Sequence, residues 1–105
     1  MSTVDEVKKL LESRFDKSAA EGLDVVFQLN IEGEQNYQLI VKDGAYQLLD
    51  GDAEDPDVTL ITDLQTLYDI ISGEENGFAA FTSGKLKAEG DLTQAMKLES
   101  LFPSA

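Results

Sequence analysis

The side chains of this chain that could act in chemistry are mainly carboxylates and hydroxyls. The 105 residues include 21 Asp and Glu but neither His nor Cys. A serine nucleophile needs a neighbouring base, and histidine is the usual base at neutral pH. Pairs of carboxylates could act as acid and base, but with this many acidic residues such pairs are expected by chance. We therefore expect no enzymatic activity, no catalytic residue and no cofactor.

The acidic loop at positions 50–57 is the segment that suggests a metal site. A helix-loop-helix calcium site needs Gly at its sixth position and Glu at its twelfth. Counted from Asp50, these positions hold Asp55 and Ile61, and a count from Asp52 fails in the same way. We therefore expect a solvated loop and no metal ion.

Apolar side chains concentrate in the last quarter of the chain. Phe78 and Phe81 lie three residues apart, and Leu86 follows in a short alternating segment. The final helix is then apolar over a broad arc, formed by Leu92, Ala95, Met96, Leu98, Leu101 and Phe102. A helix packed on a sheet needs a narrower stripe, and methionine adapts to ligands of varied shape. The pattern by itself fits either a plain hydrophobic core or an apolar binding site.

The same segment carries the pattern F-x-x-F-x-x-G-K-L-K-x-x-G-x-x-x-x-A-x-K-L, which runs from Phe78 to Leu98. Upstream, the tetrapeptide D-V-T-L at 57–60 precedes a helix around Leu67 and a glycine at position 73. Together these features resemble the sterol carrier protein 2 family of lipid-binding domains. The C-terminal half resembles the family in its motifs, and the earlier strands resemble it in their order.

The resemblance implies one domain over residues 1–105, with a five-stranded sheet and a hydrophobic tunnel between sheet and helices. The tunnel would hold a fatty acid, a fatty acyl-CoA, a sterol or a phospholipid. Gly84 and Gly90 look like the bounds of the last strand. Lys85 and Lys87 are not expected to anchor a headgroup, because they alternate with Leu86. The residues expected to line the tunnel are Leu67, Ile71, Phe78, Phe81, Leu86, Met96, Leu98 and Phe102.

The first half of the chain predicts two helices followed by a three-stranded meander. Thr3 and Glu6 form a capping box that starts a helix ending near Phe15, and Asp16 caps a short second helix. Apolar residues then alternate at 24–32, and again in two further segments that end at Asp50-Gly51. This period of two predicts strands, and Asp43-Gly44 between the second and third predicts a tight hairpin.

The second half predicts a fourth strand at 58–62 and a helix that Asp63 caps. The segment 78–82 is either helical or extended, a strand follows at 85–89, and a last helix follows at 92–102. This order predicts an α+β fold, in which helices cover one face of a mostly antiparallel sheet. The pattern leaves open whether the fifth strand pairs in a parallel or an antiparallel direction.

The formal net charge of -13 limits the partners. Nucleic acid phosphates and anionic membranes both repel an acidic chain, so we expect neither as a partner, whereas a basic protein remains compatible. No apolar run approaches the ~20 residues of a membrane span. The chain shows neither a secretory signal nor a peroxisomal tripeptide. We therefore expect a cytoplasmic protein without stable membrane insertion.

The sequence thus predicts non-catalytic binding and intracellular transfer of a hydrophobic ligand. The alternative is an accessory or assembly module that docks an enzyme of a lipid or isoprenoid-quinone pathway. In that case the negative charge would match a basic surface on the enzyme. The identity of the lipid, the oligomeric state and the pathway are left open by the sequence.

Overall fold

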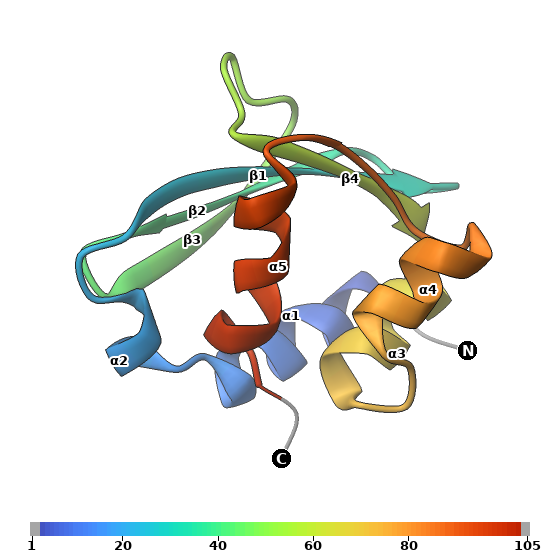
Figure 1. Ribbon diagram of the computed structural model, residues 1–105, viewed down its shortest axis with the longest axis horizontal. Coiled ribbons are helices and arrows are strands. Elements are labelled where there is room, and N and C mark those ends of the chain that lie inside the picture. Colours follow the sequence, from blue (N-terminus) through green and yellow to red (C-terminus); the bar gives the residue numbers. More distant parts are fainter. Residues whose placement is uncertain (1–2, 104–105) are drawn as a thin grey trace.

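The computed structural model describes residues 3–103, a five-stranded sheet with helices packed on one face (Figure 1). The strand order is β3-β2-β1-β4-β5. β1 and β4 are parallel, and the other neighbouring pairs are antiparallel. The predicted α+β fold is therefore confirmed, and the fifth strand pairs antiparallel with β4. The strands are β1 (Asp24–Glu32), β2 (Tyr37–Lys42), β3 (Ala45–Asp50), β4 (Val58–Asp63) and β5 (Lys87–Gly90).

Five helices lie on the same side of the sheet within residues 3–103: α1 (Val4–Arg14), α2 (Lys17–Ala20), α3 (Leu64–Ser72), α4 (Gly77–Ser83) and α5 (Leu92–Leu101). Each begins after a side chain that accepts a backbone N–H of its first turn, which satisfies donors that have no partner within the helix. The predicted capping box of Thr3 and Glu6 is present. Asn76 caps α4 and makes the ambiguous segment 78–82 helical.

β1 lies at the centre of the sheet and shows why the two faces differ. Val25, Phe27, Leu29 and Ile31 alternate along the strand and are all buried. Because side chains of a strand point alternately to opposite faces, these four lie on the side that the helices cover. The opposite face is crossed by the connection between β3 and β4, residues 51–57, drawn above the sheet in Figure 1.

This connection is bound to the sheet. Gln28 on β1 is buried, its Oε1 accepts the Ala53 N–H at 2.6 Å, and its Nε2 donates to Asp52 Oδ1 at 3.1 Å. The Val26 N–H donates to Asp57 Oδ2 at 2.8 Å. The loop is mostly exposed, in agreement with the predicted solvated loop, and it is in addition hydrogen-bonded to β1. A buried amide needs hydrogen-bond partners, and the acidic loop supplies them.

β5 begins at Lys87, two residues later than the sequence predicted. The N–H groups of Lys85 and Leu86 both donate to the carbonyl of Ala80, at 2.9 and 3.1 Å. Those donors close the C-terminal end of α4, where helix carbonyls lack partners within the helix. Leu86 therefore belongs to the turn that joins α4 to the sheet.

The core below β1 and β2 ends in an aromatic cluster of Phe15, Tyr46 and Phe102. The ring of Phe15 lies 4.7 Å from that of Tyr46, and both lie 5.4 Å from the ring of Phe102, measured between centroids. Burial raises the pKa of the Tyr46 hydroxyl above its ordinary value of 10.0, and the Glu12 carboxylate acts in the same direction. This end of the molecule is filled by its own side chains.

Candidate functional site

An apolar cavity of about 240 Å³ lies between the sheet and helices α3, α4 and α5. Its lining is almost entirely hydrocarbon, which fits a ligand that avoids water. The lining residues are Leu29, Ile31, Leu60, Thr62, Leu67, Ile70, Gly77, Phe78, Phe81, Leu86, Ala88, Leu92, Ala95, Met96, Leu98 and Glu99.

The sheet forms the floor of the cavity. Leu29 on β1 pairs in register with Leu60 on β4, which pairs in turn with Ala88 on β5. Ile31 and Thr62 form the same kind of pair two residues further along. Residues opposite each other in neighbouring strands point to the same face, so three strands present one continuous apolar surface.

The walls of the cavity come from helix faces. Leu67 and Ile70 lie three residues apart on α3, and Phe78 and Phe81 lie three residues apart on α4. Residues three or four apart on a helix share a face. Each helix therefore presents its apolar side chains toward the same space.

The rim of the cavity is apolar and open to solvent. Phe78 is 68% exposed and Met96 is 71% exposed, and Leu92 and Phe81 are also exposed. All four line the cavity. Large apolar side chains gathered in one exposed patch usually mark a binding site, since leaving them in water is unfavourable.

Two polar side chains belong to the lining. The hydroxyl of Thr62 donates to the Lys85 carbonyl at 2.9 Å, which fixes β4 to the turn after α4. The Gly77 N–H donates to Glu99 Oε1 at 3.0 Å, which joins the start of α4 to α5. Both contacts link elements that border the cavity and so set its shape.

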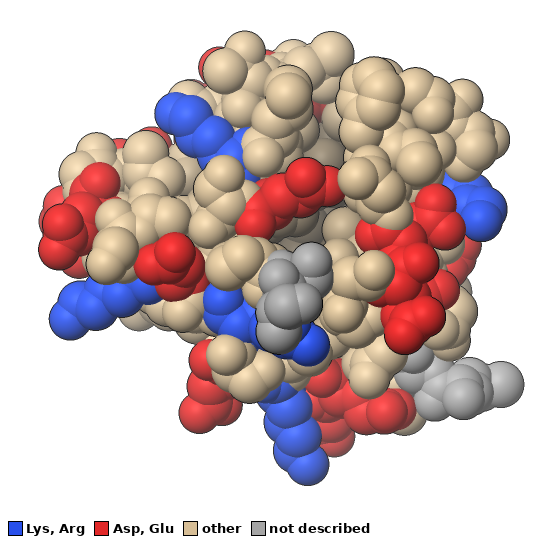
Figure 2. All heavy atoms as spheres, turned by 60° about the horizontal axis from the view of Figure 1, so that its bottom comes forward, with Lys and Arg blue, Asp and Glu red and all other residues tan. Residues whose placement is uncertain are grey.

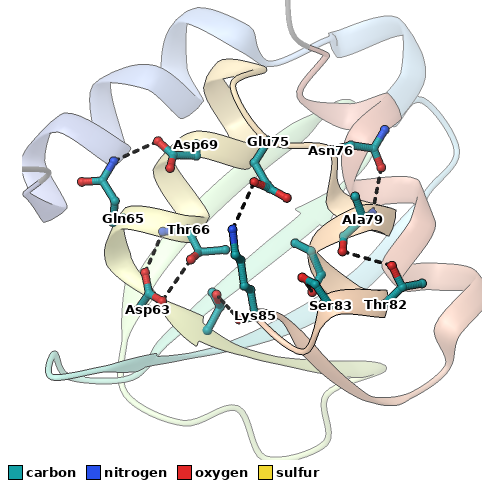
Figure 3. Close-up of polar contacts among 12 residues, drawn as sticks. Asp63, Gln65, Thr66, Asp69, Glu75, Asn76, Ala79, Thr82, Ser83 and Lys85 are labelled. Carbon is teal, nitrogen blue, oxygen red and sulfur yellow. Dashed lines mark hydrogen bonds and ion pairs between the residues drawn. The ribbon is translucent and has the colours of Figure 1, made fainter.

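The α3–α4 corner is held by polar contacts of its own (Figure 3). Asp63 accepts the N–H and the hydroxyl of Thr66 at 2.7 and 3.0 Å, which anchors the start of α3. The Lys85 ammonium lies 3.6 Å from Glu75 Oε2, an ion pair between the two ends of the α4 segment. The bonds of Gly77 to Glu99 and of Thr62 to Lys85 attach α4 to α5 at its start and to β4 at its end, while its exposed phenylalanines line the cavity.

Six of the eight residues that the sequence predicted for the tunnel line this cavity. Ile71 and Phe102 instead lie in the hydrophobic core, and Phe102 belongs to the aromatic cluster. On α3 the cavity is lined by Ile70 and not by Ile71, because successive residues of a helix point about 100° apart. The structure shows a cavity with an open mouth, and a continuous tunnel stays a prediction. The six lining residues are Leu67, Phe78, Phe81, Leu86, Met96 and Leu98.

The sheet residues of the cavity floor and Glu99 on α5 were not predicted from the sequence. Leu29 and Leu60 carry the alternation that identified their strands, but alternation does not tell which core residues lie under a cavity. Glu99 had a detectable signal. It lies seven residues after Leu92 and three after Met96, so it continues the apolar stripe of α5.

Two curated relatives align with most of the chain. "Hydroxysteroid dehydrogenase-like protein 2" of Xenopus tropicalis is 30% identical over 104 residues, which cover 96% of this chain and 25% of the relative. "Oleate-induced peroxisomal protein POX18" of Candida maltosa is 35% identical over 104 residues, which cover 90% of this chain and 82% of the relative. The chain thus spans a quarter of the first relative and most of the second.

Two solved structures show the same fold. The sec-alkylsulfatase Pisa1 from Pseudomonas sp. superposes with a TM-score of 0.86 and 25% identity, over 99% of this chain and 17% of that chain. Palmitated SCP2L2 from Aedes aegypti superposes with a TM-score of 0.71 and 28% identity, over 94% of this chain and 93% of that chain.

A family model matches nearly the whole of the chain. It describes the SCP-2 sterol transfer family and matches residues 5–103. The match includes all the strands and the helices α3, α4 and α5, and therefore every element that lines the cavity. The chain belongs to the SCP-2 sterol transfer family.

Proposed function

We propose that this chain binds a lipid in the apolar cavity and releases it chemically unchanged. The observation that carries the proposal is the cavity itself, with its hydrocarbon lining and its exposed apolar rim. The chain belongs to a family of lipid-binding domains, and the palmitated relative from Aedes aegypti makes an acyl chain a reasonable occupant. Fatty acids, fatty acyl-CoA, sterols and phospholipids are the candidate ligands.

The size of the cavity agrees with partial burial of such a ligand. A dry cavity of about 150 Å³ in another protein holds a benzene molecule, and this cavity has about 240 Å³. It would receive part of an acyl chain, and the remainder would lie against Phe78 and Met96 on the rim. The two side chains would then lose contact with water, which favours binding.

The expected affinity is moderate. Each methylene buried gains about 0.8 kcal/mol. Association costs roughly 4–15 kcal/mol in lost freedom, so a buried acyl chain leaves a net affinity near the micromolar range. Such an affinity allows uptake and release without an energy source, as a passive carrier requires.

The experiment is a cavity-filling pair of variants. Ala95 lines the cavity, and Ala79 is exposed on α4 outside the lining. Ala95→Phe should abolish displacement of a fluorescent fatty acid and the co-purification of lipid seen by native mass spectrometry. Ala79→Phe should leave both unchanged. Equal binding by the two variants, or no binding by the unaltered protein, would contradict the proposal.

The remaining expectations stay predictions. Within residues 3–103, no helix has both the length and the apolar character that crossing a bilayer requires. The names of two relatives refer to peroxisomes, and the cytoplasmic location stays a prediction. Docking to an enzyme of a lipid or isoprenoid-quinone pathway has no specific observation in its favour.

A further inference from the structure

The charge of the cavity lining comes from one residue. Among the described residues that line the cavity, Glu99 is the one with an ionisable side chain, and it is exposed. Glutamate carries one formal negative charge at pH 7. The polar end of a ligand would therefore meet a negative charge, and no lysine or arginine of residues 3–103 lines the cavity to balance it.

The carboxylate is fixed in place. Glu99 lies on the same face of α5 as Leu92, Ala95 and Met96, so the helix directs it toward the cavity. Its Oε1 accepts the Gly77 N–H at 3.0 Å, and a Cβ atom on Gly77 would come within 2.6 Å of that oxygen. Within residues 3–103, Oε2 has no hydrogen-bond partner and is left as an acceptor.

The surroundings add to the negative charge. Glu99 also lines a second hollow next to the cavity, together with Glu75. Figure 2 shows acidic side chains around a hollow on the helical side of the molecule. Lys85 carries a positive charge beside Leu86, but its ammonium lies 3.6 Å from Glu75 Oε2, so that charge is already partly balanced.

We infer that Glu99 makes the cavity selective for lipids whose polar end is uncharged, and disfavours carboxylates and phosphates. A ligand hydroxyl could donate to the free Oε2, whereas a carboxylate would face a like charge where water is partly excluded. The preferred class is therefore long-chain or polycyclic alcohols. This inference rests on the proposed function and assigns the ligand class within it.

The experiment compares decanol with decanoate, which share a chain length and differ in the charge of the polar end. Each displaces a neutral fluorescent probe, Nile red, from the full chain at pH 8 and low salt. We expect decanol to compete at a concentration about tenfold lower than decanoate, as a nearby like charge at a partly exposed site would produce. Glu99→Gln keeps the acceptor for the Gly77 N–H and removes the charge, so the ratio should fall to about threefold or less.

The control is Glu21→Gln, which removes the same charge from the exposed end of α2, outside the cavity lining. This variant should keep the ratio of the unaltered protein. The inference is overturned if both ligands compete equally in the unaltered protein, or if Glu99→Gln leaves the ratio unchanged. If neither ligand nor probe binds at all, the proposed function fails instead, so the two failures can be told apart.

Discussion

The two halves of the sheet carry the same alternation of apolar residues but end in different kinds of interior. Below β2 and the first part of β1, helices α1 and α2 and the end of α5 fill the space, and Phe27, Leu39 and Leu101 are fully buried. Below β4, β5 and the end of β1, which carries Leu29 and Ile31, the lining surrounds a cavity of about 240 Å³. The difference comes from what covers the sheet, since the strand pattern is alike in both halves.

Helix α5 crosses from one half to the other and shows the contrast along its own length. At its C-terminal end, Leu101 is 0% exposed, and Phe102 just beyond it is 3% exposed. Near its N-terminal end, Leu92 and Met96 are exposed at the cavity rim. One end of this helix therefore contributes to the stability of the fold, and the other end contributes to the binding surface.

The largest effect should come from the filled half. Leu101→Ala leaves a void among packed side chains and should lower the free energy of unfolding by about 2–5 kcal/mol. Met96→Ala removes a side chain that is mostly in solvent and should change it by less than about 0.5 kcal/mol, while weakening lipid binding. Urea unfolding followed by circular dichroism measures both. A similar decrease in the free energy of unfolding for the two variants would contradict the distinction between a packed half and a hollow half.

A smaller effect is expected at the edge of the hollow half, where β5 ends. Gly90 has φ +99°, and a Cβ atom there would lie 2.8 Å from the Asp57 carbonyl oxygen. Gly51 has nearly the same φ, +97°, but open space around the added atom. Both alanine variants strain the backbone.

The expected difference between these two glycines is therefore steric. Gly90→Ala should be destabilising by more than about 1 kcal/mol, and by more than Gly51→Ala, because the β4 backbone must move. Thermal unfolding of the two variants side by side gives the comparison. Equal decreases in stability for the two variants would mean that the contact between residue 90 and the start of β4 adds no steric penalty.

The smallest effect concerns Tyr46 in the filled half, whose pKa is raised by burial and then by Glu12. The folded state holds this proton more tightly than the unfolded state does. The stability it contributes is therefore fully present below pH 10 and is lost as the pH rises through the raised pKa. Tyr46→Phe should make the alkaline decline of stability shallower above pH 10, and an unchanged decline would show that Tyr46 does not contribute to it.

The fold was predictable because its signals are local. The capping residues Thr3, Asp63 and Asp91 and the hairpin at Asp43-Gly44 identify the ends of elements within a few residues of chain. Buried Gln28 could not be predicted as an anchor for the loop at 51–57, since its partners in that loop, Asp52 and Ala53, are more than twenty residues away. Its role depends on a crossing that only the folded chain makes.

The candidate site was predictable in part for the same reason. Phe78, Phe81 and Met96 stand in recognisable patterns, and the structure places all three at the cavity. Phe102 continues the apolar arc of the last helix in the sequence. In the structure, however, it turns away after Leu101 and joins the aromatic cluster, because Phe15 and Tyr46 offer it a buried place there.

The sequence by itself determined the order of helices and strands outside segment 78–82, the α+β class and the apolar character of the last quarter. Those features follow from periodicity and capping, which act over a few residues. The tertiary structure decided which apolar residues fill the core and which surround a cavity, and it placed Glu99 at that cavity. These outcomes depend on the distance between elements that are far apart in the chain. A leucine on the sheet belongs to the packed core where a helix lies directly against it, and it lines the cavity where a space remains between sheet and helix.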